Sequence, residues 1–256
     1  MADKAVIRTD FAAKAQEWLD YVTEVHPVEI TTSICNSNIY SPDFHAEMPA
    51  TPTRRISLMD TDSVRALFAL DKNCEATVFN FASYKYPGGM FLDGSTAQEE
   101  ALCHRSTLFP VLTSFDEVYY APNRKNLNRG LYTNRAIFSK GILFYNHDNS
   151  EQRFANVLTC ASPNWLTAQK YCGVSKSENN REVRERLKWL NEVLANEQVN
   201  TFIAGAWGCG VFRQNPTFMA RAMVEELTYP EWLIFAIPSG NNFIAFGEEL
   251  KKGRTQ

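Results

Sequence analysis

Apolar runs alternate with amphipathic segments along most of the chain, a pattern that predicts strands and helices in turn. An amphipathic helix is expected first, with Asp10 as its cap. Its buried face would carry Phe11, Ala15, Trp18, Leu19 and Val22. The predicted strands are residues 28–34, 55–59, 76–81, 141–145, 155–160, 200–204 and 232–237. Further helices are predicted from residue 60 or 61 to about 70, from 95 or 96 to about 108, over 179–194, from Asn215-Pro216 onward, and near 242–250.

Strands that are apolar throughout and alternate with helices predict an α/β fold, with a mixed central sheet flanked by helices on both faces. Segment 36–52 is expected to be a loop, and segment 107–135 is expected to be the least regular part of the chain. The chain contains no internal repeat, low-complexity tract or convincing linker, so we expect a single domain over residues 1–256. Ligands of such sheets bind at the carboxyl ends of the strands.

Composition narrows the class of protein. The 256 residues are 45% hydrophobic and 21% charged, which is ordinary for a globular protein. The formal charge of -3 gives no overall attraction to nucleic acid or to an anionic membrane. No stretch approaches the ~20 apolar residues of a membrane span, and the start of the chain does not resemble a secretion signal. Because the six cysteines and four histidines are scattered, we expect a reduced, cytoplasmic protein without structural metal. We also expect a monomer that needs no cofactor.

The first chemically informative motif follows the strand predicted at residues 76–81. It runs from Asn80 through Pro87-Gly88-Gly89-Met90 to Gln98-Glu99-Glu100. Glycine permits a positive φ and lets a ligand approach the backbone, although a plain turn explains the glycines equally well. Thr96 with Glu99 also fits a capping box, which leaves Gln98 and Glu100 unexplained. Successive helical residues are rotated by about 100°, so the two glutamates are expected to play different roles.

The second motif follows the strand predicted at residues 200–204. It reads Gly205-Ala206-Trp207-Gly208-Cys209-Gly210-Val211-Phe212. Successive amides in such a turn form a concave anion site, and the spacing fits neither a Walker loop nor the dinucleotide fingerprint. Trp207 is expected to fill the space under the loop. Cys209 is expected to be a small residue in a tight turn and not a nucleophile.

Together the two motifs resemble the signature of the poly(ADP-ribose) glycohydrolase family, bacterial type, which has a macrodomain fold. That signature is three glycines, a short spacer and Gln-Glu-Glu, after an Asn-Phe-Ala strand end like Asn80-Phe81-Ala82. Weaker similarities occur at residues 123–124, 131–133 and 161–164. The resemblance implies a macrodomain-like sheet with an N-terminal helical extension over about residues 1–50. In one departure, Met90 replaces the third glycine; it is expected to crowd the ribose or phosphate and to adopt a glycine conformation only at a cost.

The resemblance also implies an enzyme that cleaves the ribose glycosidic bond and releases ADP-ribose. Glu100 would be the catalytic acid and then the base, with its pKa raised by burial. Glu99 would hold ribose hydroxyls, Gln98 would support the loop and Asn80 would bind the same ribose. The other expected substrate-binding residues are Gly88, Gly89, Met90, Gly205, Ala206, Trp207, Gly208, Cys209, Gly210, Val211 and Phe212, of which Phe212 would stack on the ligand.

Three alternatives stay open at this stage. One is a hydrolase for single ADP-ribose units on protein or nucleic-acid bases, in which Met90 blocks a polymer. Another is a non-catalytic ADP-ribose-binding module, and the third is a nucleotide-sugar enzyme that shares only the fold. The expected partner is therefore ADP-ribose, or a protein or nucleic acid that carries it, and not a membrane.

Overall fold

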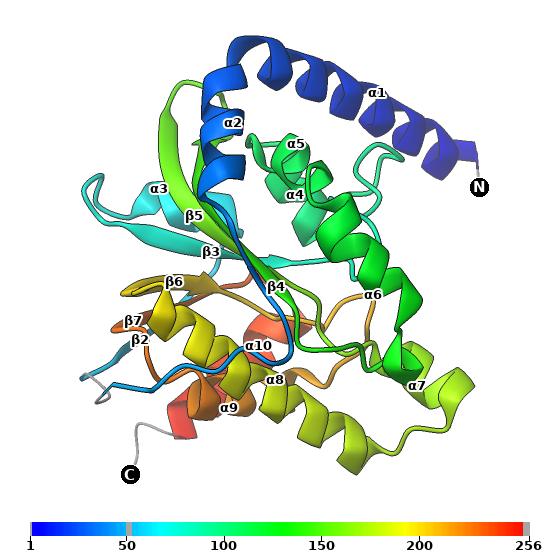
Figure 1. Cartoon of the computed structure of the whole chain (residues 1–256), viewed down its shortest axis with the longest axis vertical. Coiled ribbons are helices and arrows are strands. Elements are labelled where there is room, and N and C mark those ends of the chain that lie inside the picture. The colour runs from blue at the N-terminus through cyan, green and yellow to red at the C-terminus, as the bar shows by residue number, and fades with distance from the viewer. Residues whose placement is uncertain (1, 50–52, 253–256) are drawn as a thin grey trace.

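The computed structural model describes residues 2–49 and 53–252. Its centre is a seven-stranded sheet with the order β1-β4-β5-β3-β6-β7-β2 (Figure 1). The strands are β1 (Asn38–Tyr40), β2 (Arg55–Met59), β3 (Ala76–Phe81), β4 (Ala136–Tyr145), β5 (Gln152–Cys160), β6 (Thr201–Ala204) and β7 (Trp232–Ala236). All seven predicted segments except 28–34 are strands, which confirms most of the predicted sheet.

The sheet is mixed, as expected. The neighbours β5-β3-β6-β7-β2 all pair in parallel, whereas β4 is antiparallel to β5 and β1 is antiparallel to β4. The carboxyl ends of the parallel strands therefore meet at one edge of the sheet. Both glycine motifs leave the sheet at that edge, since one follows β3 and the other follows β6.

Helices cover both faces of the sheet (Figure 1). Side chains of β3 alternate between two cores, with Val78 in one and Phe79 in the other. The first core includes residues of α1 (Ala2–Val25), α2 (Pro27–Asn36), α3 (Ser63–Ala69), α4 (Gln98–Cys103) and α5 (Leu108–Thr113). The second includes residues of α8 (Lys176–Asn196), α9 (Pro216–Glu226) and α10 (Asn241–Lys252). This arrangement confirms the predicted α/β architecture with helices on both faces.

The N-terminal segment corrects two predictions. The strand predicted at residues 28–34 is wrong, because the helix α2 occupies this segment and begins with Pro27 in its first turn. Tertiary contacts override the β-branched composition: Ile30 is buried, and the Ser33 hydroxyl donates to the carbonyls of Lys140 and Gly141 in β4. Asp10 is not a cap, because α1 continues through it, and its carboxylate instead pairs with Lys14 one turn later.

The helix predicted from residue 95 or 96 to about 108 is also corrected. The structure has two short helices, α4 and α5, separated by a turn at residues 104–105 and an isolated β-bridge between Ser106 and Phe144. The Ser106 hydroxyl donates to the carbonyl of Leu102 and accepts from the amide of Leu108, while the Thr107 amide donates to Leu143 of β4. These bonds satisfy backbone groups that a continuous helix would have used.

The segment 107–135 is helical in short pieces. After α5 come a π-helical turn η1 (Asp116–Tyr120), the helix α6 (Ala121–Lys125) and a 3-10 turn η2 (Asn128–Gly130). Two further elements were not predicted, namely β1 and the helix α7 (Trp165–Cys172). The helix start predicted at Asn215-Pro216 is confirmed, since α9 begins at Pro216 and the Asn215 side chain accepts from the amide of Phe218. Residues 50–52, at the end of the predicted loop 36–52, lie outside the described residues. Within residues 2–49 and 53–252, no helix is long and apolar enough to cross a membrane.

Candidate active site

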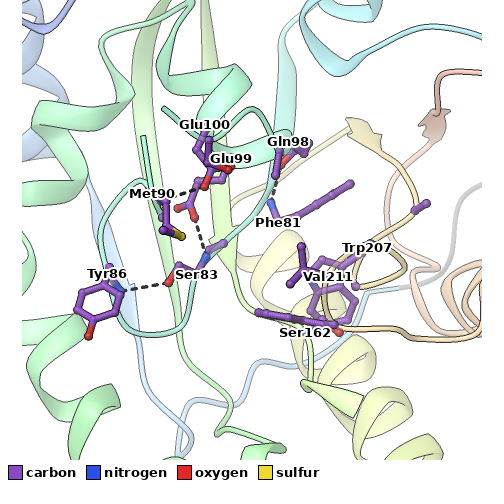
Figure 2. A pocket seen from close by; sticks show the side chains of 18 of the residues that line it. Phe81, Ser83, Tyr86, Met90, Gln98, Glu99, Glu100, Ser162, Trp207 and Val211 are labelled. Atoms are coloured by element: carbon purple, nitrogen blue, oxygen red, sulfur yellow. Dashed lines mark hydrogen bonds between the residues drawn. The ribbon is translucent and has the colours of Figure 1, made fainter. Parts of the chain in front are cut away.

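A pocket of about 580 Å³ lies where the two glycine motifs leave the sheet (Figure 2). Its volume falls in the range of ~300–1,000 Å³ typical of small-molecule sites. Figure 2 shows the two carboxylates and Met90 on one side of the cavity, with Trp207 and Val211 on the other. The lining residues are Phe81, Ala82, Ser83, Tyr86, Gly89, Met90, Asp93, Ser95, Ala97, Gln98, Glu99, Glu100, Ser162, Ala206, Trp207, Gly208, Gly210, Val211 and Phe212.

Gly89 brings the backbone against both carboxylates. Its φ is 61°, in the left-handed region that favours glycine. A Cβ atom on Gly89 would lie 2.5 Å from Glu100 Oε1 and 3.0 Å from Glu99 Oε2. Any side chain at this position would therefore displace the acids.

Met90 does not carry the expected conformational cost. Its φ is not among the positive values of the described residues, so a residue with a side chain fits this position without strain. The prediction of a strained Met90 backbone is therefore wrong, although its side chain does line the pocket.

Gln98 ties the start of α4 to the end of β3. Its Oε1 atom accepts from the amide of Phe81 at 2.8 Å, and its Nε2 atom donates to the carbonyl of Phe79 at 2.8 Å. These two hydrogen bonds take the place of hydrogen bonds to a neighbouring strand for the last residues of β3. This geometry agrees with the expected supporting role of Gln98.

Glu99 lines the pocket but is almost fully buried, with 3% of its area exposed. Its Oε2 atom accepts from the amide of Ser83 at 2.6 Å, and its Oε1 atom accepts from Asn80 Nδ2 at 3.2 Å. The capping-box interpretation is wrong, because α4 begins after Ala97 without any side-chain cap bond. Burial raises the pKa of Glu99 to about 8, and these hydrogen bonds only partly offset the loss of solvent.

Glu100 presents a different arrangement of its carboxyl group. Its Oε1 atom accepts from the amide of Met90 at 2.9 Å. Within the described part of the chain, no donor contacts its Oε2 atom, and the residue lines the pocket. One oxygen is therefore fixed by the backbone while the other is free to meet a ligand.

The second motif forms a turn with amides that point away from the protein's own acceptors. The amide of Cys209 donates to Ala206 and that of Gln214 donates to Gly208, which close the turn. Among the described residues, the amides of Gly208, Gly210, Val211 and Phe212 have no acceptor. All four residues line the pocket, so their N–H groups are available to an anionic ligand.

Gly208 lets this turn pass close to the segment that follows β5. Its φ is 74°, and a Cβ atom there would collide with the Ser162 side chain. By contrast, a Cβ atom on Gly210 would meet nothing within 4 Å. The outer part of the loop therefore faces open space in which a ligand fits.

The side chains of the second motif mostly support the loop. Trp207 is fully buried, and its indole N–H donates to the carbonyl of Cys160 at 3.0 Å, which confirms its expected role as filler. Burial raises the pKa of the Cys209 thiol to about 12, so this group stays protonated near neutrality and is a poor nucleophile. Phe212 packs edge-on against Tyr132, with ring centroids 6.0 Å apart.

The structure brings most of the predicted site residues together. Asn80, Gly88, Gly205 and Cys209 are not part of the pocket wall, and Asn80 lies behind Glu99 with no exposed surface. The wall also includes residues that sequence reasoning did not select as site residues, namely Phe81, Ala82, Ser83, Tyr86, Asp93, Ser95, Ala97 and Ser162. Ser162 could have been selected because it follows the strand predicted at residues 155–160. The contact of Ser83 with Glu99 depends on a turn that the sequence does not indicate.

The charges of the pocket are unusual for an anion site. Among the described residues that line it, the acids Asp93, Glu99 and Glu100 are present, and no Lys, Arg or His is. An anionic ligand must therefore be held by backbone amides and not by cationic side chains. Elsewhere in the described residues, no group of three or more His, Cys, Asp and Glu side chains is arranged to hold a metal ion.

Comparison with known proteins agrees with this geometry. The family model for the catalytic domain of microbial-type PARG, poly(ADP-ribose) glycohydrolase, matches residues 11–147, which include the first glycine motif. No curated protein sequence matches the chain.

Solved structures with the same fold extend over nearly the whole chain. The poly(ADP-ribose) glycohydrolase from Thermomonospora curvata superposes with a TM-score of 0.82 at 23% identity, covering 94% of this chain and 100% of that chain. The same enzyme bound to the inhibitor ADP-HPD gives 0.80 at 22% identity, covering 94% and 99%. The Deinococcus radiodurans enzyme in complex with ADP-ribose gives 0.77 at 25% identity, covering 87% and 97%. Because the family model spans more than half of its length, this chain belongs to the microbial-type poly(ADP-ribose) glycohydrolase family.

Proposed function

We propose that this protein hydrolyses the bond at the anomeric carbon of the distal ribose in ADP-ribose modifications and releases ADP-ribose. The observation that carries the proposal is the Glu100 carboxyl group, with one oxygen held by the Met90 amide and the other free in the pocket. The family and the ADP-ribose and ADP-HPD complexes of the similar enzymes support the choice of ligand.

In the proposed binding mode, the diphosphate lies against the second motif. The free amides of Gly208, Gly210, Val211 and Phe212 supply donors there without any positive side chain. The distal ribose then lies between this loop and the acids of α4. Phe212 lines the pocket, and in this binding mode its ring contacts the adenosine part of the ligand.

The reaction then proceeds through Glu100 as acid and base. Its carboxyl group gives a proton to the leaving oxygen as the bond between that oxygen and the anomeric carbon breaks. The resulting carboxylate takes a proton from water, whose oxygen forms the new bond to the oxocarbenium-like carbon. Glu100 ends protonated again, so the cycle consumes one water and no other reactant.

Glu99 is proposed to position the ribose and to keep the site from carrying two full negative charges. With a pKa of about 8, its carboxyl group is largely protonated at neutral pH. A neutral Glu99 provides a hydroxyl donor beside the ribose and lowers the electrostatic repulsion with Glu100.

The direct test is Glu100→Gln with Glu248→Gln as its control. Glu248 is an exposed residue of α10, outside the pocket. Loss of the proton donor should lower kcat on ADP-ribosylated substrate by roughly 10²-fold or more, while calorimetry still shows ADP-ribose binding. The control should match the wild type. Undiminished turnover by Glu100→Gln would refute the catalytic assignment, and binding without turnover by the wild type would favour a binding module.

The remaining proposals concern the cellular location, the domain organisation and the oligomeric state. We propose a cytoplasmic location, which the dispersed cysteines support because they do not form a disulfide framework. The single continuous sheet, to which β1 of the N-terminal segment adds an edge strand, supports one domain, and we propose that it acts as a monomer.

A further inference from the structure

Met90 stands at the mouth of the pocket beside the reacting group. Its amide is 2.9 Å from Glu100 Oε1, and 47% of the residue is exposed while its side chain lines the pocket. Figure 2 shows this side chain next to the two carboxylates and across the cavity from Trp207 and Val211.

The connectivity of ADP-ribose sets which side of the pocket receives the leaving group. The diphosphate is attached to C5 of the distal ribose, whereas the bond to be cleaved is at C1, on the far side of the ring oxygen. With the diphosphate on the second motif and C1 at Glu100, the leaving group points away from that motif. Met90 and Tyr86 lie on that side of the pocket, across the cavity from Trp207 and Val211.

The side of the pocket that carries Met90 is poorly suited to a bulky, anionic leaving group. A thioether on a flexible, unbranched chain fills irregular space and offers no hydrogen-bond donor. The next unit of a polymer would bring an adenosine ribose and two phosphates to this place. No Lys, Arg or His among the described residues of the pocket wall would compensate their charge. A compact acceptor, such as an amino-acid side chain, meets neither difficulty.

We infer that Met90 is a specificity-determining residue that contacts the leaving group and favours a single ADP-ribose on a compact acceptor over the next unit of a polymer. The inference rests on the proposed function. It concerns only what is attached to C1, so it predicts no change in the binding of free ADP-ribose.

The test measures kcat/KM on poly(ADP-ribose) and on peptides that carry one ADP-ribose through a hydroxyl or a carboxyl group. Met90→Ala and Met90→Gly are compared with Leu92→Ala, which removes another exposed apolar side chain of the same loop outside the pocket wall. A few methylenes at such a contact are worth roughly 10-fold or more in discrimination. We therefore expect both Met90 variants to shift the ratio of polymer to peptide cleavage by that factor toward polymer. Leu92→Ala should leave the ratio unchanged.

Free ADP-ribose provides the internal check. Its Kd should be the same in the wild type and in all three variants, because it lacks a leaving group. An unshifted ratio in the Met90 variants would overturn the inference, as would a shift accompanied by a tenfold or larger loss of ADP-ribose affinity, which would indicate a disturbed loop. A wild type that cleaves neither substrate would instead refute the proposed function itself.

Discussion

At the scale of single residues, the two adjacent glutamates differ in what holds them. Both oxygens of Glu99 are bound by protein donors in a buried site, while Glu100 keeps one oxygen free. The helix places them on different sides, as the ~100° rotation between neighbours requires. On this difference rests the proposal that Glu99 positions the ribose and Glu100 transfers the proton.

The buried Glu99 makes stability depend on pH. Its pKa rises from the ordinary 4.5 to about 8 on folding, so the folded state binds the proton more tightly. Its contribution to stability is fully present below about pH 4.5 and is lost as pH rises through about 8. Between pH 6 and pH 9 the wild type should lose ~2–3 kcal/mol more unfolding free energy than Glu99→Gln.

Urea denaturation at the two pH values measures this difference. Glu248→Gln, which removes an exposed carboxylate, should follow the wild type. Equal pH dependence of the wild type and Glu99→Gln would mean that Glu99 is ionised in the folded protein.

Substitution by alanine should affect the stability of the protein differently at two glycines of the pocket. Gly89→Ala forces a Cβ atom to 2.5 Å from Glu100 Oε1 at a left-handed φ, and should destabilise the protein by about 1–3 kcal/mol. Gly210→Ala adds a methyl group to open space at an unstrained φ, so it should not destabilise the protein. Thermal unfolding compares the two, and an equal Tm for both variants would contradict the close approach seen at Gly89.

The acids, the glutamine and the two loops could be predicted as parts of one site from their residues, their spacing and the resemblance to a known family. The partners of those acids could not. That Ser83 and Asn80 hold Glu99 depends on a turn that brings residues 16 and 19 positions away against α4. The replacement of a glycine by Met90 suggested a strained backbone at this position. The prediction was wrong because the φ angle of Met90, which the sequence does not reveal, is not positive.

At the scale of elements, α1 is docked on the loop that carries part of the pocket wall. Arg8 Nε donates to the carbonyl of Asp93 at 2.8 Å. Gly94 has a φ of 76°, and a Cβ atom there would collide with the carbonyl of Arg8 and approach the amide of Ala12. The helix thus lies directly against the segment between Met90 and α4.

Gly94→Ala is therefore expected to loosen α1. Hydrogen exchange of the α1 amides should accelerate, because the helix backbone cannot yield to the added methyl group. Gly173→Ala is a matched control: its φ of 63° imposes similar strain, but nothing lies within 4 Å of the added atom. Unchanged exchange in α1 of the Gly94→Ala protein would contradict this docking.

Elements with strong apolar runs could be predicted, and those decided by tertiary contacts could not. The strands β3, β6 and β7 are buried on both sides and have nearly the predicted bounds. The helix α2 has the composition of a strand, and its packing on β4 through Ser33 and Ile30 decides its conformation. The three-residue strand β1 exists only because the edge of β4 is available to it.

At the scale of the whole molecule, the charge distribution predicts an unusual anion site. The chain carries a formal charge of -3, and the described residues of the pocket wall include three acids and no base. Backbone dipoles at short range are screened little by salt. Raising the salt from 0.05 to 0.5 M should therefore change the Kd for ADP-ribose by less than about threefold. Isothermal titration measures this, and a tenfold loss would show that cationic side chains hold the diphosphate.

The most direct test of the central claim is a crystal structure of Glu100→Gln with ADP-ribose bound. We expect the diphosphate on the amides of Gly208, Gly210, Val211 and Phe212, and C1 of the distal ribose beside residue 100. A ligand bound elsewhere, or a residue 100 side chain turned away from that ribose, would contradict the account.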